Sequence, residues 1–381
     1  MEIADSSNRP YFATVARGLE TIAAQELTSL GAQMVQPEFA GVSFCGDRQL
    51  LYRVNLWSRV IYRVLMPIAQ VRAEGAEDLY RGVYDLDWSV YLSPEQTFLI
   101  DCTGKNSRLN HSHFTALQIK NAIVDQQRDR WGHRSNIDRL NPHLVINAHI
   151  RNNQCHLSLD SSARSLHRRG YRPAMGLAPL KETLASALLL MAQWNPTQAL
   201  YDPLCGSGTF LLEAGLKSLN IAPGKFQTQF GFQNWPHYDP PLWQGLLAQA
   251  QAEELSQARA PLWGSDQAPE TIAQARSNAQ ACGLDSQIHF FCQNLAAIEA
   301  PAGEGILICN PPYGQRLGVA RELGDFYRQL GDIFKQRFKG WTAFVLSGNK
   351  ELTKCIGLRP ARRMPVFNGS LPCTFLKYEL Y

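Results

Sequence analysis

The sequence predicts an α/β protein whose C-terminal half is organised around a parallel β-sheet. Residues 305–309 form an uninterrupted, mostly apolar run, which is typical of a strand buried on both faces. Residues 199–219 combine an apolar run, a glycine loop and apolar residues at helical spacing. A strand, a glycine turn and a helix in this order are typical of open α/β sheets that hold a ligand at the carboxyl ends of their strands.

Length and composition indicate an ordinary globular protein that is large enough for two or three domains. Of its 381 residues, 45% are hydrophobic and 18% are charged, which excludes an intrinsically disordered chain. The formal net charge of +4 is too small to identify a partner. The longest apolar stretch, residues 184–194, is too short to span a bilayer, so we expect no association with a membrane.

Cysteine usage indicates a reducing compartment. The nine cysteines form no Cys-x-x-Cys pair and no cluster with zinc-finger spacing, so we expect free thiols and no metal site. The first ten residues are mostly polar and resemble neither a signal peptide nor an anchor. We therefore expect a cytoplasmic protein.

The first 165 residues predict two small modules that mix helices and strands. In residues 1–68 we expect strands at 11–15, 41–45 and 59–65, and helices at 18–27 and 47–57. In residues 69–165 we expect helices at 78–84 and 112–130, and strands at 97–102, 144–151 and 155–159. Asn152-Asn153, between the last two strands, is a hairpin signal.

Residues 166–381 predict a seven-stranded sheet with helices between its strands. The expected strands are 199–201, 262–266, 288–292, 305–309, 341–346 and two more within 361–381, on either side of Asn368-Gly369. The expected helices are 181–194, 210–219, 244–258, 269–282 and 325–338. An insertion rich in aromatic residues and proline, 226–243, separates the second helix from the third.

Polar residues stand where the predicted strands end. Asp202 precedes the glycine loop, and an acid at a strand tip can hold a cationic or amine-bearing ligand. Gly206 and Gly208 allow the backbone to approach that ligand closely, and the following helix offers free N–H groups. Asp266 ends the next strand, where an acid can bind ribose hydroxyls, and Asn294 ends the third.

The tetrad Asn310-Pro311-Pro312-Tyr313 follows the strand at 305–309. Because Asn310 precedes a proline, a helical conformation is disfavoured and a stiff loop begins there. The side-chain carbonyl of Asn310 and the backbone carbonyl of Pro311 are two acceptors suited to a planar NH2 group. Tyr313 offers a ring on which a base can stack. A proline-rich turn that only closes a core strand is the alternative.

Two groups of basic residues are candidates for contacts with phosphates. Lys105 and Arg108 lie between a predicted strand and a predicted helix. Arg168, Arg169 and Arg172 belong to the densest basic run of the chain, which contains no acidic residue. Such a run is either a solvated surface or a strip that binds a nucleic-acid backbone.

The order of the glycine loop, Asp266 and the tetrad on successive strands resembles a class I S-adenosylmethionine-dependent methyltransferase. Over nearly the whole chain, residues 14–20, 166–172, 180–185 and 202–209 resemble the THUMP-domain RNA guanine-N2 methyltransferases. The similarity is strongest to the guanine-N2 half of bifunctional bacterial enzymes that modify large-subunit ribosomal RNA, so we expect the second half to be absent. The resemblance implies a ferredoxin-like module (1–68), an α+β THUMP RNA-binding domain (69–165) and a Rossmann-like methyltransferase domain (166–381).

The resemblance also implies a role for each candidate residue. S-adenosylmethionine is the expected cofactor, with Asp266 at its ribose and Asn294, where the family commonly has Asp, at its adenine. The expected cofactor-binding residues are Asp202, Pro203, Cys205, Gly206, Ser207, Gly208, Thr209, Asp266 and Asn294. The expected catalytic residues are Asn310, Pro311, Pro312 and Tyr313, and the expected RNA contacts are Lys105, Arg108, Arg168, Arg169 and Arg172.

The expected reaction is methylation of the exocyclic N2 of a guanine in structured RNA. Ribosomal 23S RNA is the favoured substrate, and transfer RNA is left open. The same tetrad serves N6-adenine methyltransferases of DNA or RNA and enzymes that methylate a glutamine amide in proteins, so these are alternatives. A non-catalytic RNA-binding factor for ribosome assembly is an alternative of another class.

Overall fold

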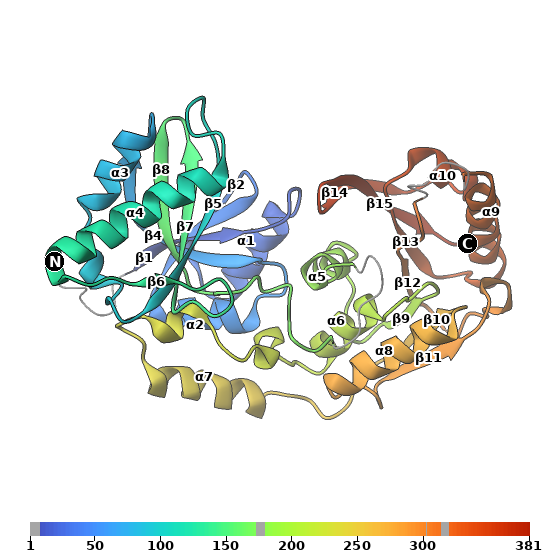
Figure 1. Ribbon diagram of the computed structural model, residues 1–381. Coiled ribbons are helices and arrows are strands. Elements are labelled where there is room, and N and C mark those ends of the chain that lie inside the picture. Colours follow the sequence, from blue (N-terminus) through green and yellow to red (C-terminus); the bar gives the residue numbers. More distant parts are fainter. Residues whose placement is uncertain (1–7, 173–179, 302, 314–319) are drawn as a thin grey trace.

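The computed structural model describes residues 8–172, 180–301, 303–313 and 320–381. The chain forms two sheets that lie in separate lobes, joined through helices α5 (Glu182–Met191) and α6 (Thr209–Ser218) (Figure 1). This confirms the predicted mixed α/β class. Within the described part of the chain, no helix combines the length and the apolar character needed to cross a bilayer.

The N-terminal lobe is built on an eight-stranded sheet with the order β2-β3-β1-β4-β8-β7-β5-β6. Its strands are β1 (Arg9–Thr14), β2 (Gln33–Glu38), β3 (Gly41–Gly46), β4 (Arg63–Arg72), β5 (Thr97–Gly104), β6 (Asn136–Ile137), β7 (Leu144–Arg151) and β8 (Gln154–Asp160). Its helices are α1 (Glu20–Ser29), α2 (Arg48–Trp57), α3 (Ala76–Tyr84), the 3-10 helix η1 (Trp88–Val90) and α4 (Ser112–Trp131).

The two predicted N-terminal modules share this one sheet through β4. One edge of β4 pairs with β1, where Leu65 opposes Phe12, and the other pairs with β8, where Leu65 opposes Asp160. The expected boundary between residues 68 and 69 falls inside this strand. The first module, β1-α1-β2-β3-α2-β4, has the ferredoxin-like order, and its β2 had no counterpart among the expected strands. Since β2 has no buried residue, its sequence carries no alternation from which a strand could be read.

The C-terminal lobe is built on a seven-stranded sheet with the order β11-β10-β9-β12-β13-β15-β14. Its strands are β9 (Ala199–Asp202), β10 (Leu262–Asp266), β11 (Ile288–Cys292), β12 (Gly305–Cys309), β13 (Thr342–Ser347), β14 (Arg362–Asn368) and β15 (Leu371–Glu379). Besides α5 and α6, the helices of this half of the chain are η2 (Pro223–Phe226), η3 (Gly231–Asn234), α7 (Pro240–Ala252), α8 (Pro269–Ala281), η4 (Leu295–Ala297), α9 (Ala320–Arg337) and α10 (Lys350–Cys355). Of these, α7 lies beside α2 of the N-terminal lobe (Figure 1).

Strand β12 is buried on both faces, as its apolar run predicts. Leu307 and Cys309 pack in one core with α9, whereas Ile306 and Ile308 pack in another with α5 and α6. The chain passes from β9 to β10 and β11 on one side and then returns to place β12 on the other side of β9. The sheet order therefore reverses between β9 and β12, which is where open α/β sheets bind their ligands.

The aromatic insertion fastens the two lobes together. The ring of Phe232 stacks on that of Tyr52 in α2 with 4.2 Å between centroids, and the Tyr52 hydroxyl accepts a hydrogen bond of 3.0 Å from the N–H of Asp239. Asp239 also caps α7, which therefore begins at Pro240 and not at the expected residue 244. A second link is Arg17, which lies 5.0 Å from the ring of Phe39 and 4.7 Å from that of Phe367 in β14.

Candidate active site

A cavity of about 980 Å³ opens at the carboxyl ends of β9, β10 and β12. Most of the predicted cofactor and catalytic residues line it together: Asp202, Pro203, Cys205, Gly206, Ser207, Thr209, Asp266, Asn310, Pro311, Pro312 and Tyr313. The glycine loop and the tetrad, about a hundred residues apart in the sequence, thus face one space.

The register of the parallel strands explains why the glycine loop and the tetrad line the same cavity. Tyr201 in β9 pairs with Leu307 in β12, so Asp202 ends its strand close to the level at which β12 ends before Asn310. On the other side, Asp202 pairs with Gly264, so Asp266 lies just beyond Asp202 at the same edge. Parallel pairing of three neighbouring strands therefore brings these three polar side chains to one edge of the sheet.

Asp202 is the most deeply buried acid at this edge. It is 2% exposed, and its Oδ1 accepts a hydrogen bond of 3.1 Å from the N–H of Leu204. Burial raises the pKa of Asp202 well above its usual value, and the negative charge of Asp266 adds to the rise. A buried carboxylate that lines a cavity is a strong site for a cationic group, because pairing would offset its desolvation.

The glycine loop is tied to the tip of β10. The N–H of Gly206 donates to Oδ2 of Asp266 at 3.2 Å, and the N–H of Cys205 donates to the carbonyl of Ser265 at 2.9 Å. Gly206 has a φ of +54°, and a side chain added there would meet only open space, so its backbone is free for a ligand to approach. Burial raises the pKa of the Cys205 thiol well above its usual value, which keeps it neutral and unsuited to act as a nucleophile.

Gly208 and Asn294 stand apart from the other predicted cofactor residues, because neither belongs to the cavity wall. Gly208 has a φ of +87°, and a Cβ atom there would lie 3.2 Å from the Phe290 ring, so its role is close packing of α6 on the sheet. Asn294 is exposed, and its Oδ1 accepts from the N–H of Ala296 at 2.9 Å to cap η4. The wall is instead formed by Gln293 and Leu295.

The tetrad is held from both sides. The hydroxyl of Tyr313 donates a hydrogen bond to Oδ1 of Asn310. The hydroxyl of Tyr327 in α9 donates to the carbonyl of Pro312 at 3.2 Å, and Nδ2 of Asn349 donates to the carbonyl of Tyr313 at 3.5 Å. Burial raises the pKa of Tyr313, so the hydroxyl stays protonated and remains a donor.

The turn between β14 and β15 forms a wall of the cavity that the sequence reasoning missed. Residues 368–371 line the same cavity as the glycine loop. They reach this edge because β15 runs antiparallel to β13, with Thr374 opposite Ser347, so the turn lies beyond the carboxyl end of β13. The Asn-Gly pair was a recognisable signal of the hairpin, but the edge at which it turns depends on the direction of β15.

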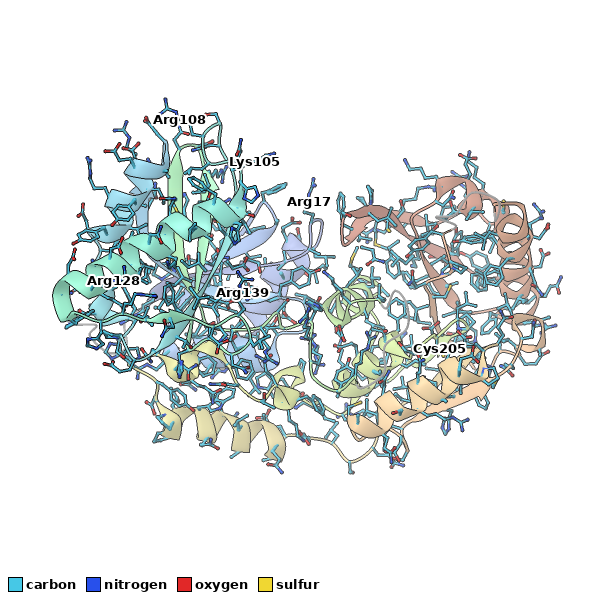
Figure 2. The ribbon with its side chains drawn as sticks, viewed as in Figure 1. Arg17, Lys105, Arg108, Arg128, Arg139 and Cys205 are labelled. Atoms are coloured by element: carbon cyan, nitrogen blue, oxygen red, sulfur yellow. The ribbon has the colours of Figure 1, made fainter. Side chains whose placement is uncertain are left out.

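Two of the predicted RNA contacts are exposed in the N-terminal lobe. Lys105 and Arg108 follow β5, far from Cys205 in the other lobe (Figure 2). Asn106 fixes their loop, since its Nδ2 donates to the carbonyl of Ala73 at 2.7 Å and its Oδ1 accepts from the N–H of Leu109 at 2.7 Å. Arg168, a third predicted contact, is also exposed.

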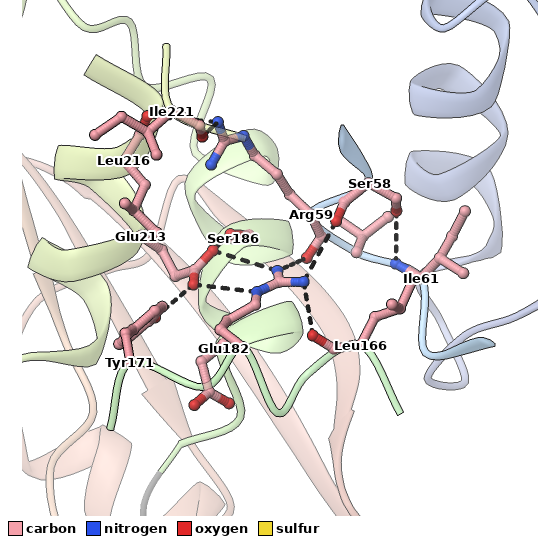
Figure 3. Close-up of polar contacts among 12 residues, drawn as sticks. Ser58, Arg59, Ile61, Leu166, Tyr171, Glu182, Ser186, Glu213, Leu216 and Ile221 are labelled. Carbon is pink, nitrogen blue, oxygen red and sulfur yellow. Dashed lines mark hydrogen bonds and ion pairs between the residues drawn. The ribbon is translucent and has the colours of Figure 1, made fainter. Parts of the chain in front are cut away.

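The prediction that Arg169 and Arg172 contact RNA is wrong. The Arg169 side chain is 2% exposed and lies 3.3 Å from the carboxylate of Glu213. This carboxylate also accepts hydrogen bonds from the hydroxyls of Tyr171 and Ser186 (Figure 3). The Arg172 side chain is 5% exposed, lies 3.4 Å from the carboxylate of Glu182 and donates to the hydroxyl of Thr209. Arg169 is buried where the lobes meet, because it also contacts Ser58 and Arg59. Arg172 is buried within the C-terminal lobe, where it also donates to the carbonyl of Leu180 at 3.3 Å. Both charges are paired inside the protein.

Three protein families match successive parts of this chain. Residues 10–65 match the RlmL ferredoxin-like domain, residues 73–160 match the THUMP domain, and residues 169–377 match the family described as RMKL-like, methyltransferase domain. The three matches follow the order of the two N-terminal modules and the C-terminal lobe.

Similar proteins cover nearly the whole chain. The protein slr0064 of Synechocystis sp., named provisionally as an RNA methyltransferase, is 68% identical over 99% of this chain and 98% of its own. The ribosomal RNA large subunit methyltransferase K/L of Shewanella sp. strain MR-7 is 42% identical over 97% of this chain but 53% of its own, so this chain spans about half its length.

A solved structure shows the same fold. SMU.472, named provisionally as a methyltransferase and crystallised with S-adenosylhomocysteine, has 29% sequence identity to this chain and a TM-score of 0.89, and the match covers 98% of both chains. The methyltransferase match alone extends over more than half of the chain. The chain therefore belongs to the RMKL-like methyltransferase family, and it joins that domain to a THUMP domain and an RlmL ferredoxin-like domain.

Proposed function

We propose that this protein transfers a methyl group from S-adenosylmethionine to the exocyclic N2 of a guanine in structured RNA. The observation that carries the proposal is that Asp202 ends β9, Asn310 directly follows the paired strand β12, and both residues line one cavity. One of these residues can hold a cation and the other can accept hydrogen bonds from an amino group. The cavity thus offers one place for a cofactor and one for a base.

The residues present fit this cofactor. The buried carboxylate of Asp202 suits the ammonium of its methionine part, and within the described residues no basic side chain lies at ion-pair distance from it. The open space over Gly206 suits close approach of the same part, and Asp266 at the neighbouring tip suits the ribose hydroxyls. When bound, S-adenosylmethionine supplies an electrophilic methyl group on a sulfonium.

The tetrad orients the accepting nitrogen. Oδ1 of Asn310 and the carbonyl of Pro311 accept hydrogen bonds from the two N–H groups of the amino nitrogen. The lone pair of this nitrogen is delocalised into the ring, and the two hydrogen bonds raise its electron density. The Tyr313 hydroxyl already holds Oδ1 of Asn310 in place. Alignment of the reacting atoms in a closed pocket can supply up to about 7–11 kcal/mol. No strong base is needed, because the N–H becomes acidic once the methyl is attached.

The N-terminal lobe supplies contacts to the RNA backbone. Lys105, Arg108 and Arg168 are exposed and suited to phosphates, and a base must be swung out of its helix to reach the tetrad. The relatives named as methyltransferase K/L act, by their name, on large-subunit ribosomal RNA, which supports this RNA as the substrate. Transfer RNA is the other RNA to test.

The rival activities share the chemistry of two acceptors and one amino group. A solved structure from Listeria monocytogenes, described as a predicted N6-adenine-specific DNA methylase, has 28% identity to this chain and a TM-score of 0.86. Incubation with methyl-tritiated cofactor and protein-free ribosomal RNA, transfer RNA or DNA, followed by nucleoside chromatography, separates the candidates. We expect N2-methylguanosine from RNA. N6-methyladenosine, labelled DNA or the absence of label would overturn the proposal.

A further inference from the structure

A second cavity, of about 610 Å³, lies outside the site described above, between α10 and the strands β14 and β15. We call it the α10 groove. Its floor is mostly apolar and its rim is basic. The floor residues are Leu358, Pro360, Pro365, Leu376 and Tyr378, and the rim residues are Lys350, Lys354, Arg359 and Arg363.

The rim presents uncompensated positive charge. All four basic side chains belong to exposed residues, and the only carboxylate paired with any of them, among the described residues, is that of Glu351, 2.8 Å from Lys354. The side chains of Arg359 and Arg363 form no ion pair or hydrogen bond with another described residue, although the backbone of Arg363 belongs to β14 and pairs with β15. Positive charges that have no intramolecular partner and surround a groove favour the binding of an anionic ligand.

The groove shares a wall with the tetrad. Asn349 lines the groove, caps α10 and donates through Nδ2 to the carbonyl of Tyr313. Ser347 also lines the groove, and its Oγ lies 3.4 Å from the hydroxyl of Tyr327, which in turn holds the carbonyl of Pro312. A ligand in the groove would therefore lie directly behind the residues that hold the target base.

We propose that the α10 groove binds the RNA strand that flanks the methylated nucleotide. The basic rim binds its phosphates, and the apolar floor packs against a ribose or a base. This inference rests on the proposed function, because a nucleotide held by the tetrad keeps its neighbours attached on both sides. Those neighbours must pass close to Tyr313, whereas Lys105 and Arg108 lie in the other lobe (Figure 2).

The test compares the double variant Arg359→Gln/Arg363→Gln with the wild-type protein. A fluorescein-labelled RNA hairpin of mixed sequence serves as the probe, and its affinity is measured over a series of salt concentrations. Since each phosphate contact on a single strand contributes about 0.7 to the slope of log K against log salt, we expect the slope to fall by about 1–2 and the affinity by about tenfold. Arg359→Lys/Arg363→Lys should retain most of the affinity.

Lys339→Gln is the matched control. Lys339 is exposed and stands just before β13, at the end of the sheet opposite the cavity, so its loss changes charge without touching the groove. We expect it to bind RNA like the wild type, and we expect all variants to bind S-adenosylhomocysteine and to melt like the wild type. Equal RNA affinity and salt slope in the Gln double variant and the wild type would overturn the proposal.

Ultraviolet crosslinking locates the bound strand. The proposal expects RNA adducts on tryptic peptides that include residues 350–378, and adducts confined to the N-terminal lobe would contradict it. Failure of the proposed function has a different signature. If the wild-type protein methylates no RNA but the Gln double variant binds RNA more weakly than the wild type, the proposed reaction is wrong and the proposed RNA binding by the α10 groove is supported. If the wild-type protein methylates RNA and the Gln double variant binds RNA as tightly as the wild type, the proposed RNA binding by the α10 groove is wrong.

Discussion

The Arg169 guanidinium lies 3.3 Å from the Glu213 carboxylate, with side-chain exposures of 2% and 0%. Arg169 also donates to the backbone carbonyls of Ser58 and Arg59 in the ferredoxin-like module, at 3.3 and 2.6 Å. Burial favours a raised pKa for Glu213, but Arg169 and the hydroxyls bonded to this carboxylate overcome it and hold the pKa below its usual value. The pair is therefore ionised, and it fixes the module to the methyltransferase domain.

Arg169→Gln should destabilise the protein by about 3–5 kcal/mol, because it leaves the Glu213 charge buried without its partner. Urea denaturation measures this loss. Arg168→Gln is the matched control, since Arg168 is the neighbouring residue and is exposed; it should change stability by less than about 0.5 kcal/mol. Equal stability of the two variants would show that the Arg169–Glu213 pair does not stabilise the fold.

Asp202→Asn should weaken binding of S-adenosylhomocysteine by about 10–100-fold, because a hydrogen bond to a charged group contributes about 1.5–3 kcal/mol. In the wild type, the raised pKa of Asp202 means that affinity falls as pH falls through that pKa, since only the carboxylate can pair with the ammonium. Calorimetry over a series of pH values above the usual carboxyl pKa should show this slope. The same slope in the Asn variant would assign it to another group.

The same raised pKa predicts the stability of the cofactor-free protein. Because the folded state favours protonated Asp202 relative to the unfolded chain, folding stability is lost as pH rises through the folded pKa. Asp202→Asn carries no charge to bury. We therefore expect its melting temperature at neutral pH to equal or exceed that of the wild type, although its ligand binding is weaker. A variant that melts well below the wild type would contradict this account.

Lys105→Gln/Arg108→Gln should weaken binding of all RNA sequences alike and reduce the salt slope by about 2, because the proposed contacts of these side chains are to phosphates and not to bases. Cofactor affinity should stay unchanged, since both residues lie in the other lobe from the cavity. RNA affinity over a salt series measures the effect. A salt slope equal to that of the wild type would show that neither residue contacts an RNA phosphate.

Tyr313 separates stacking from hydrogen bonding. Tyr313→Phe keeps the ring and removes the donor to Asn310, so kcat/KM for RNA should fall by less than tenfold. Tyr313→Ala also removes the stacking surface, which is worth about 1–3 kcal/mol per base, so kcat/KM should fall by a further 10–100-fold. Steady-state methylation of RNA gives both values, and identical losses in the two variants would argue against stacking.

The core of the site could be read from the sequence because its signals are local. The buried strands, the glycine loop and the tetrad each occupy a few consecutive residues, and parallel strands bring their carboxyl ends to one edge. The errors lie where burial depends on distant segments. Arg168 and Arg169 are the same residue type in the same basic run, and only the packing of the first module on α6 exposes one and buries the other. Asn294 likewise caps the short helix η4, which was not predicted from the sequence.

The central claim is that the tetrad serves the base while the glycine loop serves the cofactor. Its most direct test is Asn310→Ala, with the single-turnover rate of methyl transfer to RNA and the dissociation constant for S-adenosylhomocysteine measured on the same preparation. The account predicts that the rate falls by about a hundredfold or more, as for loss of one positioned polar group in an active site, while the dissociation constant stays the same. An unchanged rate, or a parallel loss of both quantities, would contradict it.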